Sequence, residues 1–264
     1  MTTVPEAFRG VWRRERITAP GLLDTTTRVF WVQSASWYGD IRVPADSPRR
    51  AGDVQGYSDA ELVALARSEG FAGQLTVTPE RCVWRRDLDY QPPTPTPDEG
   101  AWRFADRDTL VEDGVHSDYQ EIWVREPQSS GLFAAFSPDD GPGLLVLAGD
   151  HFIQVEPGLA SLPADPAFPP PALPAQVAAA CQAGRRVLAE LWLAMPICYG
   201  RIGEGWRISL STTPWREGEP LWAAPPACDD GAARFVEASG RIWSRLEVDG
   251  DEAALARAFA AAAR

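Results

Sequence analysis

Two short segments of the chain share a tryptophan followed by two arginines. They are GVWRR at residues 10–14 and CVWRR at residues 82–86. Side chains alternate across a β-strand, so in each segment the tryptophan and the second arginine share one face. An arginine on the core face needs a carboxylate, backbone carbonyl groups or a ligand anion, because burying an unpaired guanidinium is costly. The chemistry that these segments could perform is therefore anion recognition by Arg14 and Arg86.

Two interpretations of the repeated segment follow. In the first, which we favour, the tryptophans anchor a core and the arginines pair with acidic residues on neighbouring strands. In the second, the arginines reach into a cavity and bind the carboxylate or phosphate of a ligand. The segment EIWVR at 121–125 repeats the spacing of a tryptophan and an arginine on one face. The candidate ligand-binding residues are Trp12, Arg14, Trp84, Arg86, Trp123 and Arg125.

Residues for catalysis or metal binding are few. The only histidines are His116, in a turn-like DGVHSD segment, and His151, in a strand-like one. A strand residue with satisfied hydrogen bonds is the favoured interpretation of His151, and a catalytic base is the alternative. The sequence contains no G-x-S-x-G motif, no glycine-rich phosphate loop and no close pair of histidines or cysteines. We therefore predict no catalytic residue, no metal and no cofactor.

A polar set lies in the segment WVQSASWYGDIRVP, where Tyr38, Asp40 and Arg42 alternate with apolar residues. Their spacing places the three side chains on one face of a strand, near one end of the expected sheet. We predict an ion pair between Asp40 and Arg42.

Composition narrows the class of protein. The net charge of -12 argues against a nucleic-acid or anionic-membrane partner, because such partners need a basic surface. All 25 basic residues are arginine, and the chain lacks asparagine as well as lysine, which is typical of GC-rich bacterial coding. We expect a cytoplasmic protein, since no secretory leader or membrane-length apolar run is evident. The four cysteines, Cys82, Cys181, Cys198 and Cys228, are expected to be free thiols.

The elements that must position these residues are mostly strands. Alternating apolar residues between Pro- and Gly-rich turns predict eight to ten strands before residue 157. The predicted strands are 10–18, 27–44, 71–80, 82–90, 100–113, 118–126, 131–138 and 143–156. The strand at 27–44 is long enough to bend and serve two parts of a sheet. A helix is predicted from Ser58 to near Gly70, with Ser58 and Glu61 in capping-box positions.

The second part of the chain has a different pattern. The proline-rich segment 157–174 can be neither regular helix nor interior strand, so it predicts a connector between two parts. A helix is predicted at 174–195, strands at 205–215 and 234–248, and a final alanine-rich helix after residue 250. This organisation gives a barrel at 1–156, a connector at 157–174 and an α+β portion at 175–264 that completes the barrel, covers it or forms a small unit.

A strand meander that opens on the G-x-W motif of Gly10 and Trp12 resembles the lipocalin and fatty-acid-binding-protein group of barrels, the calycins. A second G-x-W lies at Gly100 and Trp102. The resemblance covers at most residues 8–156 and implies a closed antiparallel barrel that binds an apolar ligand. The chain departs from this group because it lacks disulfide spacing and places its helix after the second strand. A weaker resemblance is to a fungal family of kinase-interacting proteins with two lipocalin-like barrels.

The sequence therefore predicts a mainly β protein, an antiparallel meander closed into a lipocalin-like barrel with accessory helices and a smaller C-terminal α+β portion. The predicted function is non-enzymatic binding of a small, largely apolar or lipid-like ligand with an anionic head group met by the arginines. One alternative is a protein-interaction module with a filled barrel, in which aromatic patches contact a protein partner. Another is an enzyme of lipocalin-like fold using His151. Whether the barrel is hollow or filled separates these functions.

Overall fold

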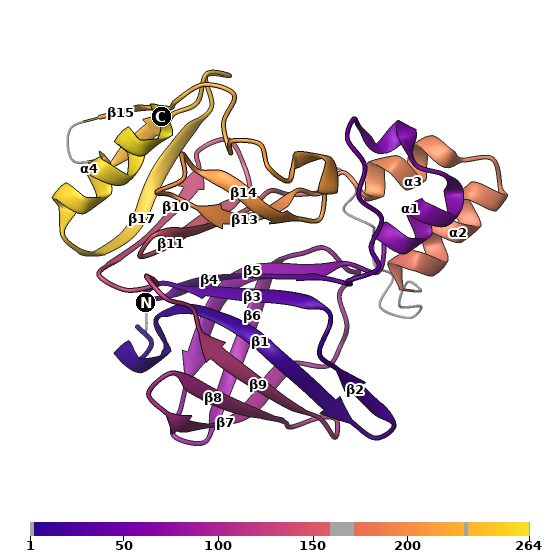
Figure 1. The fold of residues 1–264 in the computed structure, drawn as a ribbon, viewed down its shortest axis with the longest axis horizontal. Helices are drawn as coiled ribbons and strands as arrows, with labels where there is room; N and C mark the ends of the chain where they lie inside the picture. The colour runs from indigo at the N-terminus through magenta and orange to yellow at the C-terminus, as the bar shows by residue number, and fades with distance from the viewer. Residues whose placement is uncertain (1–2, 159–171, 230–231, 264) are drawn as a thin grey trace.

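The structure, a computed structural model, describes residues 3–158, 172–229 and 232–263. Two antiparallel sheets lie against each other, and three short helices cover one end of the contact between them (Figure 1). The first sheet closes into a barrel and the second remains an open, eight-stranded sheet. The predicted mainly β fold with a closed antiparallel barrel is confirmed.

The barrel has eight strands that follow one another around the ring in chain order. They are β1 (Gly10–Ala19), β3 (Arg28–Gln33), β4 (Trp37–Val43), β5 (Glu69–Val77), β6 (Arg81–Asp89), β7 (Asp98–Asp106), β8 (Thr109–Gly114) and β9 (Gln120–Arg125). The ring closes where β9 pairs with β1, with Trp123 opposite Arg14. The short strand β2 (Leu22–Asp24) forms a hairpin with the end of β1 and extends beyond the ring.

The second sheet takes its strands from both halves of the chain. In chain order they are β10 (Leu132–Pro138), β11 (Leu144–Ala148), β12 (His151–Val155), β13 (Ile197–Arg201), β14 (Arg207–Ser211), β15 (Ala227–Cys228), β16 (Arg234–Val236) and β17 (Ile242–Gly250). Their spatial order is β14-β13-β12-β11-β10-β17-β16-β15. The helix α4 (Glu252–Ala260) packs on one face through Leu255 and Phe259.

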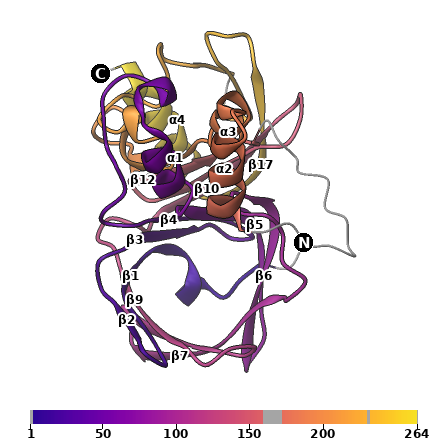
Figure 2. The ribbon, with the colours of Figure 1, turned by 90° about the vertical axis from the view of Figure 1, so that its right-hand side faces the viewer.

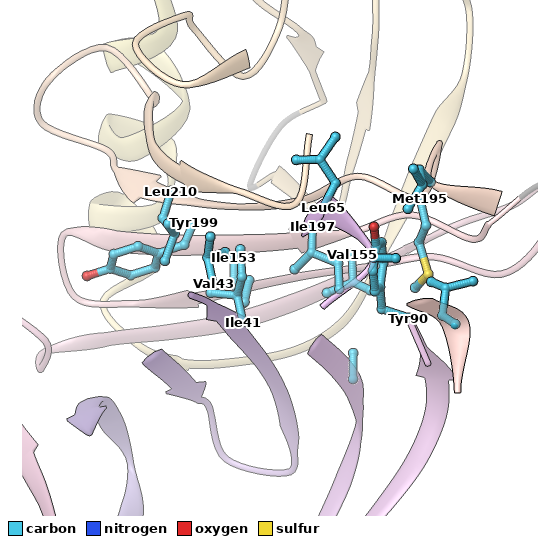
Figure 3. Packing of buried hydrophobic residues seen from close by; sticks show 14 of the residues in the cluster. Ile41, Val43, Leu65, Tyr90, Ile153, Val155, Met195, Ile197, Tyr199 and Leu210 are labelled. Atoms are coloured by element: carbon cyan, nitrogen blue, oxygen red, sulfur yellow. The ribbon is translucent and has the colours of Figure 1, made fainter. Parts of the chain in front are cut away.

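The other face of the second sheet packs on the barrel wall. Ile41 and Val43 of β4 meet Ile153 and Val155 of β12 in one buried cluster (Figure 3). The two sheets come so close at Gly39 that a Cβ atom there would lie 2.7 Å from Ile153 Cγ2. Alternate residues of β11 and β12 therefore face two different cores, which explains why these strands are apolar on both faces.

Three helices close one end of this interface. They are α1 (Asp59–Leu65), α2 (Leu173–Gln182) and α3 (Arg186–Trp192). The capping box predicted at Ser58 and Glu61 is present. The 3-10 turns are η1 (Glu6–Phe8), η2 (Val54–Gly56), η3 (Pro214–Arg216) and η5 (Ala261–Ala263).

Several predicted boundaries were wrong, and each error falls at a tight turn. The segment 27–44 is a hairpin that turns at Ser34–Ser36 rather than one bent strand, and the turn puts Asp40 and Arg42 on the barrel interior together with Trp31. The predicted strands 100–113 and 143–156 are also hairpins, and the helix at 174–195 breaks at Gly184, which has a φ of +69°.

The barrel also ends earlier than the predicted boundary at residue 156. It closes at Arg125, because β9 has its partner in β1, and β10–β12 enter the second sheet instead. Within the predicted α+β portion at 175–264, strands β13–β17 complete that second sheet rather than the barrel. Of the predicted connector at 157–174, residues 159–171 lie outside the described residues.

Candidate polar cleft at the barrel mouth

Aromatic side chains fill the barrel. The ring centroids of Trp31 lie 6.2 Å from Trp12, 5.7 Å from Trp84 and 5.8 Å from Trp123. The N-terminal turn η1 lies across the opening of the ring of strands (Figure 2), at the end of the barrel where β1 begins (Figure 1). Its Phe8 packs on the aromatic core, and the Phe8 carbonyl accepts a 2.8 Å hydrogen bond from Trp12 Nε1. One end of the barrel is thus closed by the chain itself.

A small void remains beside these rings. Its volume is about 10 Å³, which is about the space of one water-sized group. We call it the inner chamber. It is lined by Trp31, Asp40, Arg42, Phe71, Trp84, Asp98, Glu112 and Trp123. A lipid-sized molecule has no room in the barrel centre as it stands.

Charged residues replace the aromatic ones toward the other end of the barrel. Arg14 lies 2.7 Å from Glu121 and 3.1 Å from Asp24. Arg42 lies 2.9 Å from Asp40 and 3.6 Å from the same Glu121. The ion pair predicted between Asp40 and Arg42 is confirmed, and Arg14 ends in salt bridges within the barrel, as the favoured interpretation expects.

Arg86 also has its partners within the barrel. Its guanidinium contacts Asp98 at 2.7 Å and Asp89 at 3.1 Å, and its Cζ lies 3.5 Å from the ring centre of Phe71. The salt-bridge interpretation of the second Trp-Arg-Arg segment is therefore confirmed as well. Carboxylates and an aromatic ring already occupy the positions around Arg86 where a ligand anion would bind.

Glu112 differs from the other buried carboxyl groups. It sits directly opposite Glu121 in the β8–β9 pair, and the two residues are 4% and 2% exposed. Glu112 accepts hydrogen bonds from Tyr119 Oη at 2.9 Å and from Trp123 Nε1 at 3.1 Å. Among the described residues no arginine lies within ion-pair distance of it. Burial, with the nearby charge of Glu121, raises the pKa of Glu112 to about 8, so it is mainly protonated at neutral pH.

Asp40 is perturbed in the same direction. Burial raises the pKa of Asp40 to about 6 even though Arg42 beside it favours the charged form. In this polar interior carboxyl groups outnumber guanidinium groups six to three. The carboxyl groups belong to Asp24, Asp40, Asp89, Asp98, Glu112 and Glu121, and the guanidinium groups to Arg14, Arg42 and Arg86. Because Glu112 is mainly protonated, five charged carboxylates face three guanidinium groups, and the interior still has a deficit of positive charge.

A cleft of about 390 Å³ opens above the inner chamber. We call it the mouth cleft. It is lined by Trp84, Arg86, Asp89, Pro93, Thr94, Thr96, Pro97, Asp98, Glu99, His116, Ser117 and Tyr119. Trp84 and Asp98 line both the cleft and the chamber, and Tyr119 joins the cleft to Glu112 through its hydrogen bond. This volume is within the range of small-molecule sites.

The six predicted ligand-binding residues do not form one site. Trp84 and Arg86 line the mouth cleft, and Trp123 lines the inner chamber. Trp12 is fully buried in the aromatic core, and Arg14 lies among its carboxylate partners. Arg125 is at the closed end, where its Cζ lies 4.1 Å from the ring centre of Trp12. The structure thus brings two of the six to the mouth cleft and a third to the inner chamber.

Arg125 borders a second, larger cleft of about 720 Å³ between the N-terminal segment and the second sheet. Its guanidinium donates to the carbonyl oxygens of Arg9 and Ala7 and pairs with Asp108 at 3.0 Å. This cleft lies beside the closed end of the barrel, and none of its lining residues lines the inner chamber. Size alone therefore does not make it the better candidate.

Sequence reasoning missed the acidic members of the site. Asp89, Asp98, Glu112 and Tyr119 carry no motif or spacing that marks them in the sequence. One local signal was available for Glu112, because its side chain packs over Gly100, where a Cβ atom would lie 2.6 Å from Glu112 Cγ. The glycine of the second G-x-W motif, which has no side chain, thus leaves the space that the Glu112 side chain occupies.

The histidines do not form a reaction centre. His151 is fully buried, and its ring nitrogens lie 2.8 Å from Tyr199 Oη and 2.8 Å from the Pro127 carbonyl oxygen. Burial lowers the pKa of His151. His116 borders the mouth cleft, 3.3 Å from Glu99. Within residues 3–158, 172–229 and 232–263, no group of three or more histidine, cysteine or acidic residues is arranged to hold a metal ion.

Comparison with known proteins gives a fold and no function. No family profile and no curated protein matches the chain. A solved structure of an uncharacterised protein from Saccharomyces cerevisiae is similar, with 10% sequence identity and a TM-score of 0.55 over 91% of this chain and 99% of that one. The likeness shows a shared fold alone. In the described part of the chain, no helix combines the length and apolarity needed to cross a bilayer.

Proposed function

We propose that this protein is a non-enzymatic binding protein that takes a small organic cation in the mouth cleft. The observation that carries the proposal is the excess of carboxyl groups around a cleft whose floor is aromatic. Asp98 and the ring of Trp84 line both the cleft and the inner chamber, whereas Glu112 and Trp123 line the chamber alone. A cation is stabilised both by carboxylates and by the faces of tryptophan rings.

The filled barrel favours this proposal over the lipid-like ligand predicted from the sequence. The void inside the barrel holds only one water-sized group. An anionic head group at Arg86 would have to displace Asp98 and Asp89, and it would approach further carboxylates. A cation beside Asp98 and Glu112 relieves the charge imbalance instead. The proposal keeps a small ligand, as the sequence predicts, but gives that ligand a positive charge in place of an apolar body with an anionic head group.

The proposal is tested by thermal unfolding with three compounds of one size: butylammonium, butanol and butyrate. A ligand that binds only the folded state stabilises it by about 2.7 kcal/mol at a concentration of one hundred times Kd. We expect butylammonium alone to raise the unfolding temperature. Asp98→Asn removes a cleft carboxylate and should abolish the rise.

The matched control is Asp249→Asn, which changes an exposed carboxylate at the larger cleft and should leave the rise intact. Equal effects of all three compounds, or a rise that survives Asp98→Asn and is lost in Asp249→Asn, would refute the proposal.

A second candidate function is protein interaction. The tip of the β1–β2 hairpin exposes two adjacent leucines, Leu22 at 50% and Leu23 at 66%. Such exposure at the end of an extended hairpin is typical of contact surfaces. Affinity capture with three proteins tests this function. The wild-type protein and Asp98→Asn should retain a partner protein that is lost by the variant with both leucines changed to serine. If all three proteins retain the same partners, the candidate is wrong.

A further inference from the structure

The inner chamber lies directly below the mouth cleft and shares two wall residues with it, Trp84 and Asp98. The cleft holds about 390 Å³, whereas the chamber holds about 10 Å³. A ligand bound in the cleft can therefore insert no more than one water-sized group. The size of the head group is thus limited by the chamber rather than by the cleft.

The walls of the chamber determine which head group is accepted. Four aromatic rings line it, those of Trp31, Phe71, Trp84 and Trp123. Its carboxyl groups come from three strands, with Asp40 on β4, Asp98 on β7 and Glu112 on β8. The one guanidinium in the lining belongs to Arg42, which is already paired with Asp40 and Glu121. The lining of the inner chamber therefore consists mainly of hydrogen-bond acceptors and aromatic rings.

We infer that the inner chamber is the head-group site of the mouth cleft and that it selects a primary ammonium group. This inference rests on the proposed function and specifies its ligand. A primary ammonium has about the size of a water molecule and carries three N–H donors, which match the surrounding carboxyl oxygens. A quaternary ammonium has the same charge, but its methyl groups exceed the chamber and it has no N–H donor.

Glu112 supplies the counter-charge by exchanging its proton. The neutral carboxylic acid loses H⁺ to solvent as R–NH₃⁺ enters, and the resulting carboxylate pairs with the ammonium. No electrons are transferred, and one proton is released for each ammonium bound. Tyr119 Oη and Trp123 Nε1 already donate to the two oxygens of Glu112, so they hold the carboxylate in place. The raised pKa of Glu112 supports this exchange.

The charged groups around Glu112 act together in this exchange. Glu121 on β9 and Asp98 on β7 disfavour its ionisation, whereas Arg42 on β4 favours it. An ammonium placed between Glu112 and Asp98 shifts this balance toward the carboxylate. Because Glu121 stays paired with Arg14 and Arg42, Glu112 is the carboxyl group left for the ligand.

Isothermal titration calorimetry with butylammonium and butyltrimethylammonium tests the inference, since the two cations share a chain and a charge. We expect butylammonium to bind at least about tenfold more tightly. At pH 7, its binding enthalpy should also differ between phosphate and Tris buffers by the amount that corresponds to proton release. Glu112→Gln should weaken butylammonium binding about tenfold and remove the buffer dependence.

Asp249→Asn is the matched control, because Asp249 lines neither the mouth cleft nor the inner chamber. It should keep both the preference for the primary ammonium and the buffer dependence. If Glu112→Gln does not fold, the buffer dependence of the wild-type protein is the test, because equal binding enthalpies in phosphate and Tris would overturn the proton exchange. Equal affinities for the two cations would overturn the inference and leave the proposed function standing. If neither cation binds, both the inference and the proposed function are overturned.

Discussion

Replacing Glu112 with glutamine should change how the stability of the protein depends on pH. The wild-type carboxyl group has its pKa raised from 4.5 to about 8 by burial and by Glu121. The folded state therefore binds this proton more tightly than the unfolded state does. The stabilisation is complete below about pH 4.5 and is lost as the pH rises toward about 8. Glutamine does not titrate, so the stability of the variant does not fall with rising pH through this residue.

The magnitude follows from the same shift. One pKa unit corresponds to about 1.36 kcal/mol, so between pH 5.5 and pH 8.5 the wild-type protein should lose about 3 kcal/mol through Glu112. Urea unfolding followed by tryptophan fluorescence at several pH values measures the loss in both proteins. Contributions from groups such as Asp40 cancel in the difference between them.

The slope of this difference is the decisive quantity, because glutamine also changes the hydrogen bonds with Tyr119 and Trp123 by an amount that does not depend on pH. We expect wild-type stability to fall relative to the variant as the pH rises. A difference that stays constant between pH 5.5 and pH 8.5 would refute the reasoning, because Glu112 would then titrate alike in the folded and unfolded states.

Three further predictions concern the barrel and its contact with the second sheet. Trp31→Ala should lower the free energy of unfolding by about 3 to 5 kcal/mol in urea titrations, because Trp31 contacts three other core tryptophans. Gly39→Val should cost about 1 to 3 kcal/mol by the same measurement, and Ile153→Ala in the same chain should recover part of it, since the added Cβ meets Ile153. Arg14→Met should cost about 3 to 5 kcal/mol at pH 7, because it removes the 2.7 Å partner of the buried Glu121 carboxylate. A loss below about 1 kcal/mol, the range of exposed ion pairs, would contradict this expectation.

Much of the barrel could be predicted from the sequence because its strands alternate regularly between turns. The pattern in GVWRR and CVWRR gave the correct face for Trp12 and Trp84, and the pairing of their arginines with carboxylates followed from the cost of burying a charge. The hairpin turns were harder. Ser34–Ser36 has no glycine or proline, so nothing local interrupts the strand pattern at 27–44.

The site could be predicted only in part. Trp84, Arg86 and Trp123 carry a recognisable pattern, but the importance of Glu112 comes from its register opposite Glu121 in the pairing of β8 with β9. The sequence pattern of a strand with one glutamate is the same whether the face that carries the glutamate is exposed to solvent or buried. Tertiary contacts also decide which sheet the strands β10–β12 join. The barrel is already closed by β9, so these strands enter the second sheet.

A crystal structure of the protein with butylammonium tests the central claim most directly. We predict that the alkyl chain lies in the mouth cleft over Trp84, with the nitrogen in the inner chamber at hydrogen-bond distance, about 3 Å, from Glu112 or Asp98. An empty mouth cleft at saturating butylammonium, or the cation bound only at the larger cleft beside Arg125, would contradict the claim.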